Sequence, residues 1–325
     1  MYWLTWRQHR MELLVAAALL LLAALPLIVT GVTMHEQYRS DGIAACVADP
    51  ASRGGCGQLI EQFVDRYDQW ANRLLWGAFL PALAGTFVGA PLLAREYEQG
   101  TWRLAFTQSV SRTRWLLTKL ALVGSAVVVV GAAFGALFTW WRGPLNEIDG
   151  RLGAISFLIA SPSLAAAGLF AFATGVLAGA LLRRTIVAMA AALGTFLAVR
   201  LPLEEYVRPH YQAPLVRITD PQPGVETARL PDTDWIVQNS WVDAAGHRLT
   251  DGEESAIIRQ VYGGADALYS SDARVESFMI DHGLRHWTEY HPDSSFWTFQ
   301  AIEAGGFVAL AVVFLAVAVW LVRRS

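Results

Sequence analysis

Charged side chains are scarce in this chain of 325 residues. Asp, Glu, Lys and Arg make up 16% of it, whereas 54% of the residues are apolar and the mean hydropathy is +0.35. An average soluble domain has about 25% charged residues. So little charge excludes a disordered chain, a basic nucleic-acid-binding surface and most soluble enzymes. The apolar residues occur in blocks of about 20, the length that spans a bilayer as a helix. The composition therefore predicts a multi-pass membrane protein.

The sequence also lacks the short motifs of nucleotide hydrolysis and of common hydrolases. It contains no G-x-x-x-x-G-K-[ST] phosphate loop, no H-E-x-x-H zinc pair and no G-x-S-x-G nucleophile turn. We therefore expect no catalytic residue, no metal site and no cofactor bound by this chain. Lysine is almost absent: Lys119 is the only lysine, whereas the sequence has 24 arginines. We interpret this bias as that of a GC-rich bacterial genome.

Six apolar segments are long enough to cross a membrane as helices. They are residues 13–32, 74–93, 120–141, 152–182, 185–203 and 302–322. The fourth is too long for one straight crossing and contains Pro162. We expect a shallow outer piece followed by a spanning helix from about Pro162, although a kinked or re-entrant entry fits equally well.

Positive charge is concentrated on one side of the predicted membrane. Pieces 1–12, 95–119, 183–184 and 323–325 contain 11 Arg or Lys in 42 positions, whereas 33–73, 142–151 and 204–299 contain 13 in 147. Basic residues are enriched in cytoplasmic loops. The sequence thus predicts an all-α integral membrane protein of the bacterial cell (inner) membrane. It would have six transmembrane helices, cytoplasmic N- and C-termini and an extracytoplasmic segment between helices 5 and 6.

These spans divide the chain into four parts. Residues 1–12 are expected to form an N-terminal interfacial helix, 13–203 helices 1–5, 204–299 an extracytoplasmic domain, and 300–325 helix 6 with a cytoplasmic tail. The first apolar run is longer than a signal-peptide core and is not followed by a clear cleavage site, so we expect it to be retained. Helix is also expected over 252–285, and over 61–70 at the end of the outer loop 33–73.

The two cysteines, Cys46 and Cys56, are ten positions apart in the outer loop 33–73. A disulfide is the default for such a pair outside the cytoplasm. By the loop-entropy argument it would add about 2–3 kcal/mol of local stability.

Two charged residues lie inside apolar segments near the predicted outer surface. Arg200 is at the end of the fifth segment and Glu303 at the start of the sixth. Two interpretations are open: the side chains reach the outer headgroups, or they pair across neighbouring helices and line the exit of a translocation path. Lys119, at the other surface, is expected to extend back to the headgroups.

Three histidines, His282, His286 and His291, lie shortly before the last span. On a helix, His282 and His286 would share a face, a spacing that suits zinc. Gly283 weakens a helix, however, and Arg285 repels a cation. We therefore expect a solvated surface beside the membrane rather than a metal site.

The inner loop 95–115 joins two spans but is polar. Gly100 is predicted to end a short helix, and Ser111 to cap the helix that enters the third span. An ordinary basic loop at the membrane surface would show the same features.

Three G-x-x-x-G pairs predict close helix approach, and one of them is a candidate seam between two copies. They are Gly85/Gly89, Gly131/Gly135 and Gly175/Gly179.

The pattern Glu98-x-Gly100-Thr101, then Thr107-x-Ser109-Val110-Ser111-Arg112, then Trp115 and Lys119, resembles the coupling segment of ABC-2 type exporter permeases. Many members have Pro where Ser109 stands, and 204–299 is longer than the corresponding loop of simpler members. The resemblance implies that this segment contacts a separate ATPase subunit. The residues implied are Glu96, Glu98, Gly100, Thr101, Arg103, Ser111, Arg112 and Arg114.

The resemblance further implies a permease subunit of an ATP-driven exporter. Two copies, or one copy and a relative, would form a path for a hydrophobic or amphipathic substrate. ATP and Mg²⁺ would be bound by the partner, a cytoplasmic ABC ATPase, and no nucleic acid would be involved. The alternative is a membrane-anchored sensor or assembly factor that acts through 204–299. A membrane enzyme that uses the 281–291 cluster comes third.

Overall fold

The computed structural model describes residues 2–48, 53–100, 111–220, 233–262 and 273–324. The chain divides into two compact units. We call residues Met1–Arg208 with Phe296–Ser325 the membrane unit, and Pro209–Ser295 the sheet unit.

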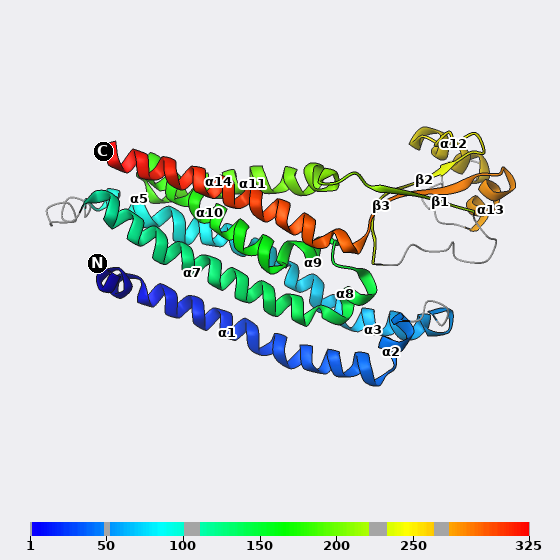
Figure 1. Cartoon of the computed structure of the whole chain (residues 1–325), viewed down its shortest axis with the longest axis horizontal. Coiled ribbons are helices and arrows are strands. Elements are labelled where there is room, and N and C mark those ends of the chain that lie inside the picture. The colour runs from blue at the N-terminus through cyan, green and yellow to red at the C-terminus, as the bar shows by residue number, and fades with distance from the viewer. Residues whose placement is uncertain (1, 49–52, 101–110, 221–232, 263–272, 325) are drawn as a thin grey trace. The chain divides into compact units, whose positions relative to one another are not determined.

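The described residues of the membrane unit are almost entirely helical (Figure 1). Its elements are α1 (Tyr2–Ser40), α2 (Ile43–Ala48), α3 (Arg53–Leu74), η1 (Leu75–Phe79), α4 (Leu80–Leu83), η2 (Ala84–Gly89), α5 (Ala90–Glu98), α7 (Arg112–Trp141), α8 (Gly143–Asp149), α9 (Ala154–Ile159), α10 (Ser161–Leu182), α11 (Thr185–Pro202), η3 (Leu203–Val207), η4 (Arg208–His210) and α14 (Phe296–Arg324). Six helical stretches are long and apolar enough to cross a membrane. The predicted all-α membrane protein with six spans is thus confirmed, and both ends of the chain lie at one end of this unit (Figure 1).

The helix boundaries follow local signals in the sequence. The fourth segment is broken at Ala160, so that α9 precedes α10 and Pro162 lies in the first turn of α10, as predicted. The predicted helix over 61–70 lies within α3. Residues 2–12 are helical but continue without a break into the first span, as part of α1.

Helix α10 is the centre of the membrane unit. It packs against α14, α7, η2, α11 and α5, and it is buried on all sides over most of its length. Close approach depends on glycine: a Cβ added at Gly175 would lie 2.2 Å from the carbonyl oxygen of Gly85. Gly131 likewise packs on Ala165. The G-x-x-x-G pairs therefore join helices of one chain, and the suggested seam between two copies at one of these pairs is wrong.

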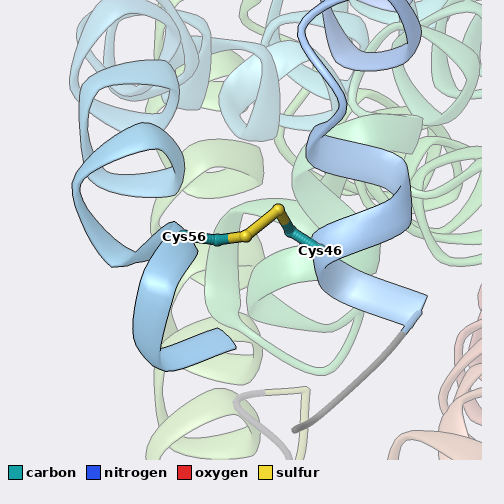
Figure 2. The surroundings of a disulfide bond; sticks show 2 residues. All are labelled: Cys46 and Cys56. Carbon is teal, nitrogen blue, oxygen red and sulfur yellow. A yellow bond between two sulfur atoms is a disulfide. The ribbon is translucent and has the colours of Figure 1, made fainter. Parts of the chain in front are cut away.

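The disulfide is confirmed. Cys46 of α2 and Cys56 of α3 are bonded, with their Cα atoms 6.1 Å apart (Figure 2). The bond joins α2, which follows the first span, to the start of α3, which leads into the second.

The sheet unit contains strands that the sequence analysis did not predict. Its elements are β1 (Leu215–Thr219), β2 (Trp235–Val242), α12 (Asp251–Tyr262), α13 (Ala273–Asp281), β3 (Arg285–His291) and η5 (Asp293–Ser295). The antiparallel sheet has the order β1-β3-β2. A small core forms beside it from Leu249, Val275, Met279 and Leu284. Of the helix expected over 252–285, α12 and α13 are present, residues 263–272 lie outside the described residues, and Arg285 is already the first residue of β3.

The histidines of this unit do not share a helix face. His286 and His291 lie on β3, whereas His282 follows α13 and donates from Nδ1 to the carbonyl of Phe278 at 2.7 Å. His286 stacks on Trp241. Among the described residues no group of three His, Cys, Asp or Glu could hold a metal ion.

Candidate functional site

The predicted coupling segment begins and ends as expected. Helix α5 ends at Glu98, and Gly100 has a left-handed φ of 68°, with its N–H donating to the carbonyl of Tyr97 at 3.3 Å. Ser111 caps α7, because its Oγ accepts from the backbone N–H of Arg114 at 3.4 Å. Thr101 and Arg103 lie outside the described residues, as does the side chain of Arg112.

Glu96, in the last turn of α5, pairs with Lys119 of α7. Only 3% of the Lys119 side chain is exposed, and its ammonium lies 4.4 Å from the centre of the Trp115 ring. The expectation that Lys119 extends to the headgroups is therefore wrong. The carboxylate of Glu96 offers a partner inside the bundle, so the ammonium can be buried without being left unpaired.

Tyr97 contacts the turn between α10 and α11. The guanidinium carbon of Arg183 lies 5.2 Å from the centre of the Tyr97 ring. Arg183 has a φ of 54°, and it is the only non-glycine residue with positive φ in the described part of the chain. This conformation reverses the chain at the end of α10, a position where glycine is usual.

Glu98 contacts the start of α11. Its Oε2 accepts hydrogen bonds from the backbone N–H of Thr185 at 3.3 Å and from the hydroxyl of Thr185 at 2.5 Å. A carboxylate at this position satisfies a free N–H of the first helical turn and interacts favourably with the positive end of the helix dipole.

Three consecutive residues at the end of α5 thus contact three other parts of the membrane unit. Glu96 binds α7, Tyr97 meets the α10–α11 turn, and Glu98 binds α11. Just before them, Leu92 and Leu93 belong to a buried apolar cluster with residues of α7, α10 and α14. Because packed interiors transmit strain, a displacement of this end of α5 would act on α7 and α11 together. We call Glu96, Tyr97, Glu98 and their partners the coupling site.

Only part of this site was predicted from the sequence. Glu96 and Glu98 were predicted to meet an ATPase, and here each has a partner in its own chain, while contact with an ATPase stays a prediction. The partners Arg183 and Thr185 were not singled out. A usable signal existed for Thr185, since threonine at the first position of an apolar run often begins a helix.

A second charged cluster is buried near the opposite end of the membrane unit. Glu303 of α14 accepts from Nη1 of Arg200 on α11 at 2.8 Å and from Nε of Arg208 at 3.3 Å. All three side chains are at most 7% exposed. The pairing interpretation of Arg200 and Glu303 is confirmed, and the headgroup interpretation is wrong. Arg208 was missed because it lies beyond the apolar segment.

A buried glutamine continues this polar layer. Gln300, one turn before Glu303, donates from Nε2 to the carbonyl of Phe157 at 2.9 Å and accepts from the backbone N–H of Ser163 at 3.0 Å. It therefore joins α14 to both sides of the break between α9 and α10. Arg208 also lies over the ring of Phe157, 4.4 Å from its centre. That Arg200 and Glu303 line a translocation path stays a prediction.

One comparison with known proteins identifies the chain. The family model described as ABC-2 membrane transporter related matches residues 16–208. This range contains the whole coupling site, together with Arg200 and Arg208. No curated protein and no solved structure matches the chain. Since the match covers more than half of the sequence and agrees with the six spans, this multi-pass membrane protein belongs to the ABC-2 membrane transporter related family.

Proposed function

We propose that the chain is the permease subunit of an ATP-driven exporter in a bacterial inner membrane, with both termini in the cytoplasm. Two copies, or one copy and a close relative, form the path for a hydrophobic or amphipathic substrate. A separate cytoplasmic ATPase binds ATP and Mg²⁺. This chain carries out no covalent chemistry.

The coupling site is the observation that carries this proposal. An exporter of this kind needs a segment that receives the movement of the ATPase and passes it to several spans at once. The end of α5 is suited to that task because its last residues bind α7 through Lys119 and α11 through Thr185. Closure of the ATPase subunits on ATP would shift α5, and these contacts would carry α7 and α11 with it.

Co-purification tests the partner. The tagged chain is extracted from its native membrane in a mild detergent, and the eluate is assayed for ATPase activity. We expect a P-loop ATPase to co-purify with the wild type and to be lost or uncoupled in the Glu98→Gln, Arg112→Gln double variant. A matched control replaces Glu36 and Arg39 with Gln, since both are exposed in the last turns of α1, and α1 ends at the opposite end of the membrane unit from α5 (Figure 1). Equal ATPase recovery and activity in all three proteins would contradict the proposal.

The disulfide offers a separate test of orientation. Cys46 and Cys56 are the only cysteines in the sequence and are bonded to each other. In intact spheroplasts, a membrane-impermeant reductant followed by an impermeant maleimide should label both cysteines. Labelling only after the membrane is opened would place this loop in the cytoplasm and reverse the proposed orientation.

The sheet unit supports a second function. It has its own apolar core beside a three-stranded sheet, as expected of a domain that folds separately from the spans. A sensor or assembly factor would use this unit and not the coupling site. In that case Glu98→Gln with Arg112→Gln would have no effect on function.

A further inference from the structure

A groove of about 570 Å³ lies between α7 and α14, toward the start of α7 and the end of α14. Its walls include Leu117, Leu120, Leu315, Val319 and Trp320, and Arg323 lies at one end. Leu117 is 50% exposed and Trp320 48% exposed, so the groove opens to the surroundings of the membrane unit. A volume of this size is within the range of ligand-binding clefts.

The charged end of the groove contains arginine and no carboxylate from its own two helices. Nε of Arg323 donates to the hydroxyl of Thr113 at 3.1 Å, and Arg324 lies over the Trp320 ring at 4.0 Å. Arg114 is exposed in the first turn of α7. The sequence has no Asp or Glu anywhere in α7 or after Glu303 in α14. The first turn of α7 adds the positive end of a helix dipole.

We propose that this groove binds one anionic phospholipid. An acyl chain would lie along the apolar walls formed by Leu117, Leu315 and Val319. The phosphate would lie beside Arg323, within reach of Arg324. Arginine is well suited to this role because its planar guanidinium binds phosphate through two parallel hydrogen bonds.

A lipid fits this surface better than a second copy of the chain. Two copies related by two-fold symmetry would bring Arg323 and Arg324 toward the same residues of the partner. Neither helix supplies a carboxylate there to compensate the repulsion between like charges. An anionic headgroup removes this repulsion, and the apolar groove supplies the contact area for its chain.

A lipid bound in this groove would lie close to residues that connect to the coupling site. Arg323 already binds α7 through Thr113, and Lys119, two turns further along α7, holds Glu96 of the coupling site. A phosphate at this point would add to the contact between the third and sixth spans. The orientation given under the proposed function would place this lipid in the cytoplasmic leaflet, whereas the binding site itself does not depend on that orientation.

Native mass spectrometry of the purified chain tests the headgroup. The protein is titrated with dioleoylphosphatidylglycerol or with dioleoylphosphatidylcholine. We expect one tight phosphatidylglycerol site, weakened about fivefold for each arginine removed in Arg323→Gln and Arg324→Gln. Arg184→Gln is the control, because Arg184 is an exposed arginine at the same end of the bundle that does not line the groove. Equal affinity for the two lipids, or equal loss in the control, would overturn the proposal.

Filling the groove tests the acyl-chain site without changing any charge. Ala121 and Ala316 line the groove and are exposed. Ala121→Phe with Ala316→Phe should abolish the phosphatidylglycerol site while the melting temperature stays close to that of the wild type. Unchanged binding in this variant would overturn the proposal.

Spontaneous disulfide-linked dimers of Ala316→Cys in the membrane would also overturn it, because a second copy would then occupy the groove. None of these measurements involves the ATPase, so their failure is distinct from failure of the proposed function.

Discussion

The carboxylate of Glu98, at the end of α5, binds both the backbone N–H and the hydroxyl of Thr185, at the start of α11. The two residues are 87 positions apart in the sequence, and the helices that carry them also pack through a buried cluster that includes Ala94 of α5 and Ala188 of α11. Two residues earlier, Glu96 forms a similar contact with Lys119 of α7. This end of the second span is therefore joined by an ion pair to the third span and by hydrogen bonds to the fifth.

Removing this contact should uncouple the ATPase from the spans. In the purified complex we expect Glu98→Ala to lower substrate-stimulated ATPase activity by more than half, and Thr185→Val to have a smaller effect in the same direction. The double variant should be no worse than Glu98→Ala alone, because the hydroxyl of Thr185 acts through that carboxylate. Fully additive losses would show that the two residues act independently.

The buried cluster near the opposite end should control stability. Glu303→Ala leaves Arg200 and Arg208 buried without their shared carboxylate. We expect a loss of about 3–5 kcal/mol in the free energy of unfolding. Adding Arg200→Gln and Arg208→Gln to Glu303→Ala should recover part of this loss, since the uncompensated charges are then gone. Thermal unfolding in detergent measures both effects, and no recovery in the triple variant would contradict the electrostatic explanation.

The difference between predicted and observed features has a physical cause. Spans, the break before Pro162 and the Cys46–Cys56 bond follow from local patterns of hydrophobicity, proline and cysteine, so the sequence was sufficient to predict them. The contact of Glu98 with Thr185 depends on which helices become neighbours. No local pattern in a single sequence shows which helices pack against each other.

The strands of the sheet unit were not predicted for the same reason, since their pairing joins residues far apart in the sequence. Strand β3 lies between β1 and β2, although both precede it in the chain, and more than 40 residues separate β2 from β3. Antiparallel pairing over such distances is not marked by a short turn motif. A helix face shared by His282 and His286 could therefore be considered from the sequence, whereas His286 lies on the central strand and His282 follows α13.

The packing of α10 on the second span gives a prediction with a matched control. A Cβ at Gly175 would collide with the backbone of Gly85 and of Ala90, whereas one at Gly194 of α11 meets nothing within 4 Å. We expect Gly175→Ala to lower the free energy of unfolding by about 1–3 kcal/mol. Gly194→Ala should be neutral or stabilising by up to about 1 kcal/mol, since alanine favours helix. Equal melting temperatures for the two variants would argue against the close contact.

The first turn of α12 in the sheet unit should become less stable at low pH. Thr250 caps α12 with Glu253, whose Oε2 accepts from the N–H of Thr250 at 2.7 Å and from its hydroxyl at 2.8 Å. These bonds lower the pKa of Glu253 below its ordinary value of 4.5. The stabilisation is thus complete above pH 4.5 and is lost as the pH falls through the lower pKa of the folded state.

Hydrogen exchange of the α12 amides in the full chain measures this effect. After correction for intrinsic exchange, protection should be constant from pH 7 to about pH 5 and should fall below it. Thr250→Val should reduce protection at neutral pH and flatten its pH dependence. A pH dependence identical in the wild type and Thr250→Val would contradict the capping explanation.

Site-specific photo-crosslinking tests the central claim most directly, since that claim is contact between the end of α5 and an ATPase. A photoreactive benzoylphenylalanine replaces Gln99, which is exposed just after Glu98, or Gln58, which is exposed in α3 on the disulfide-bonded side. After irradiation of native membranes, the account predicts a crosslinked P-loop ATPase at Gln99 and none at Gln58. The two proteins must be expressed equally for the comparison. No ATPase crosslinked at Gln99, or an ATPase crosslinked at Gln58, would then contradict the account.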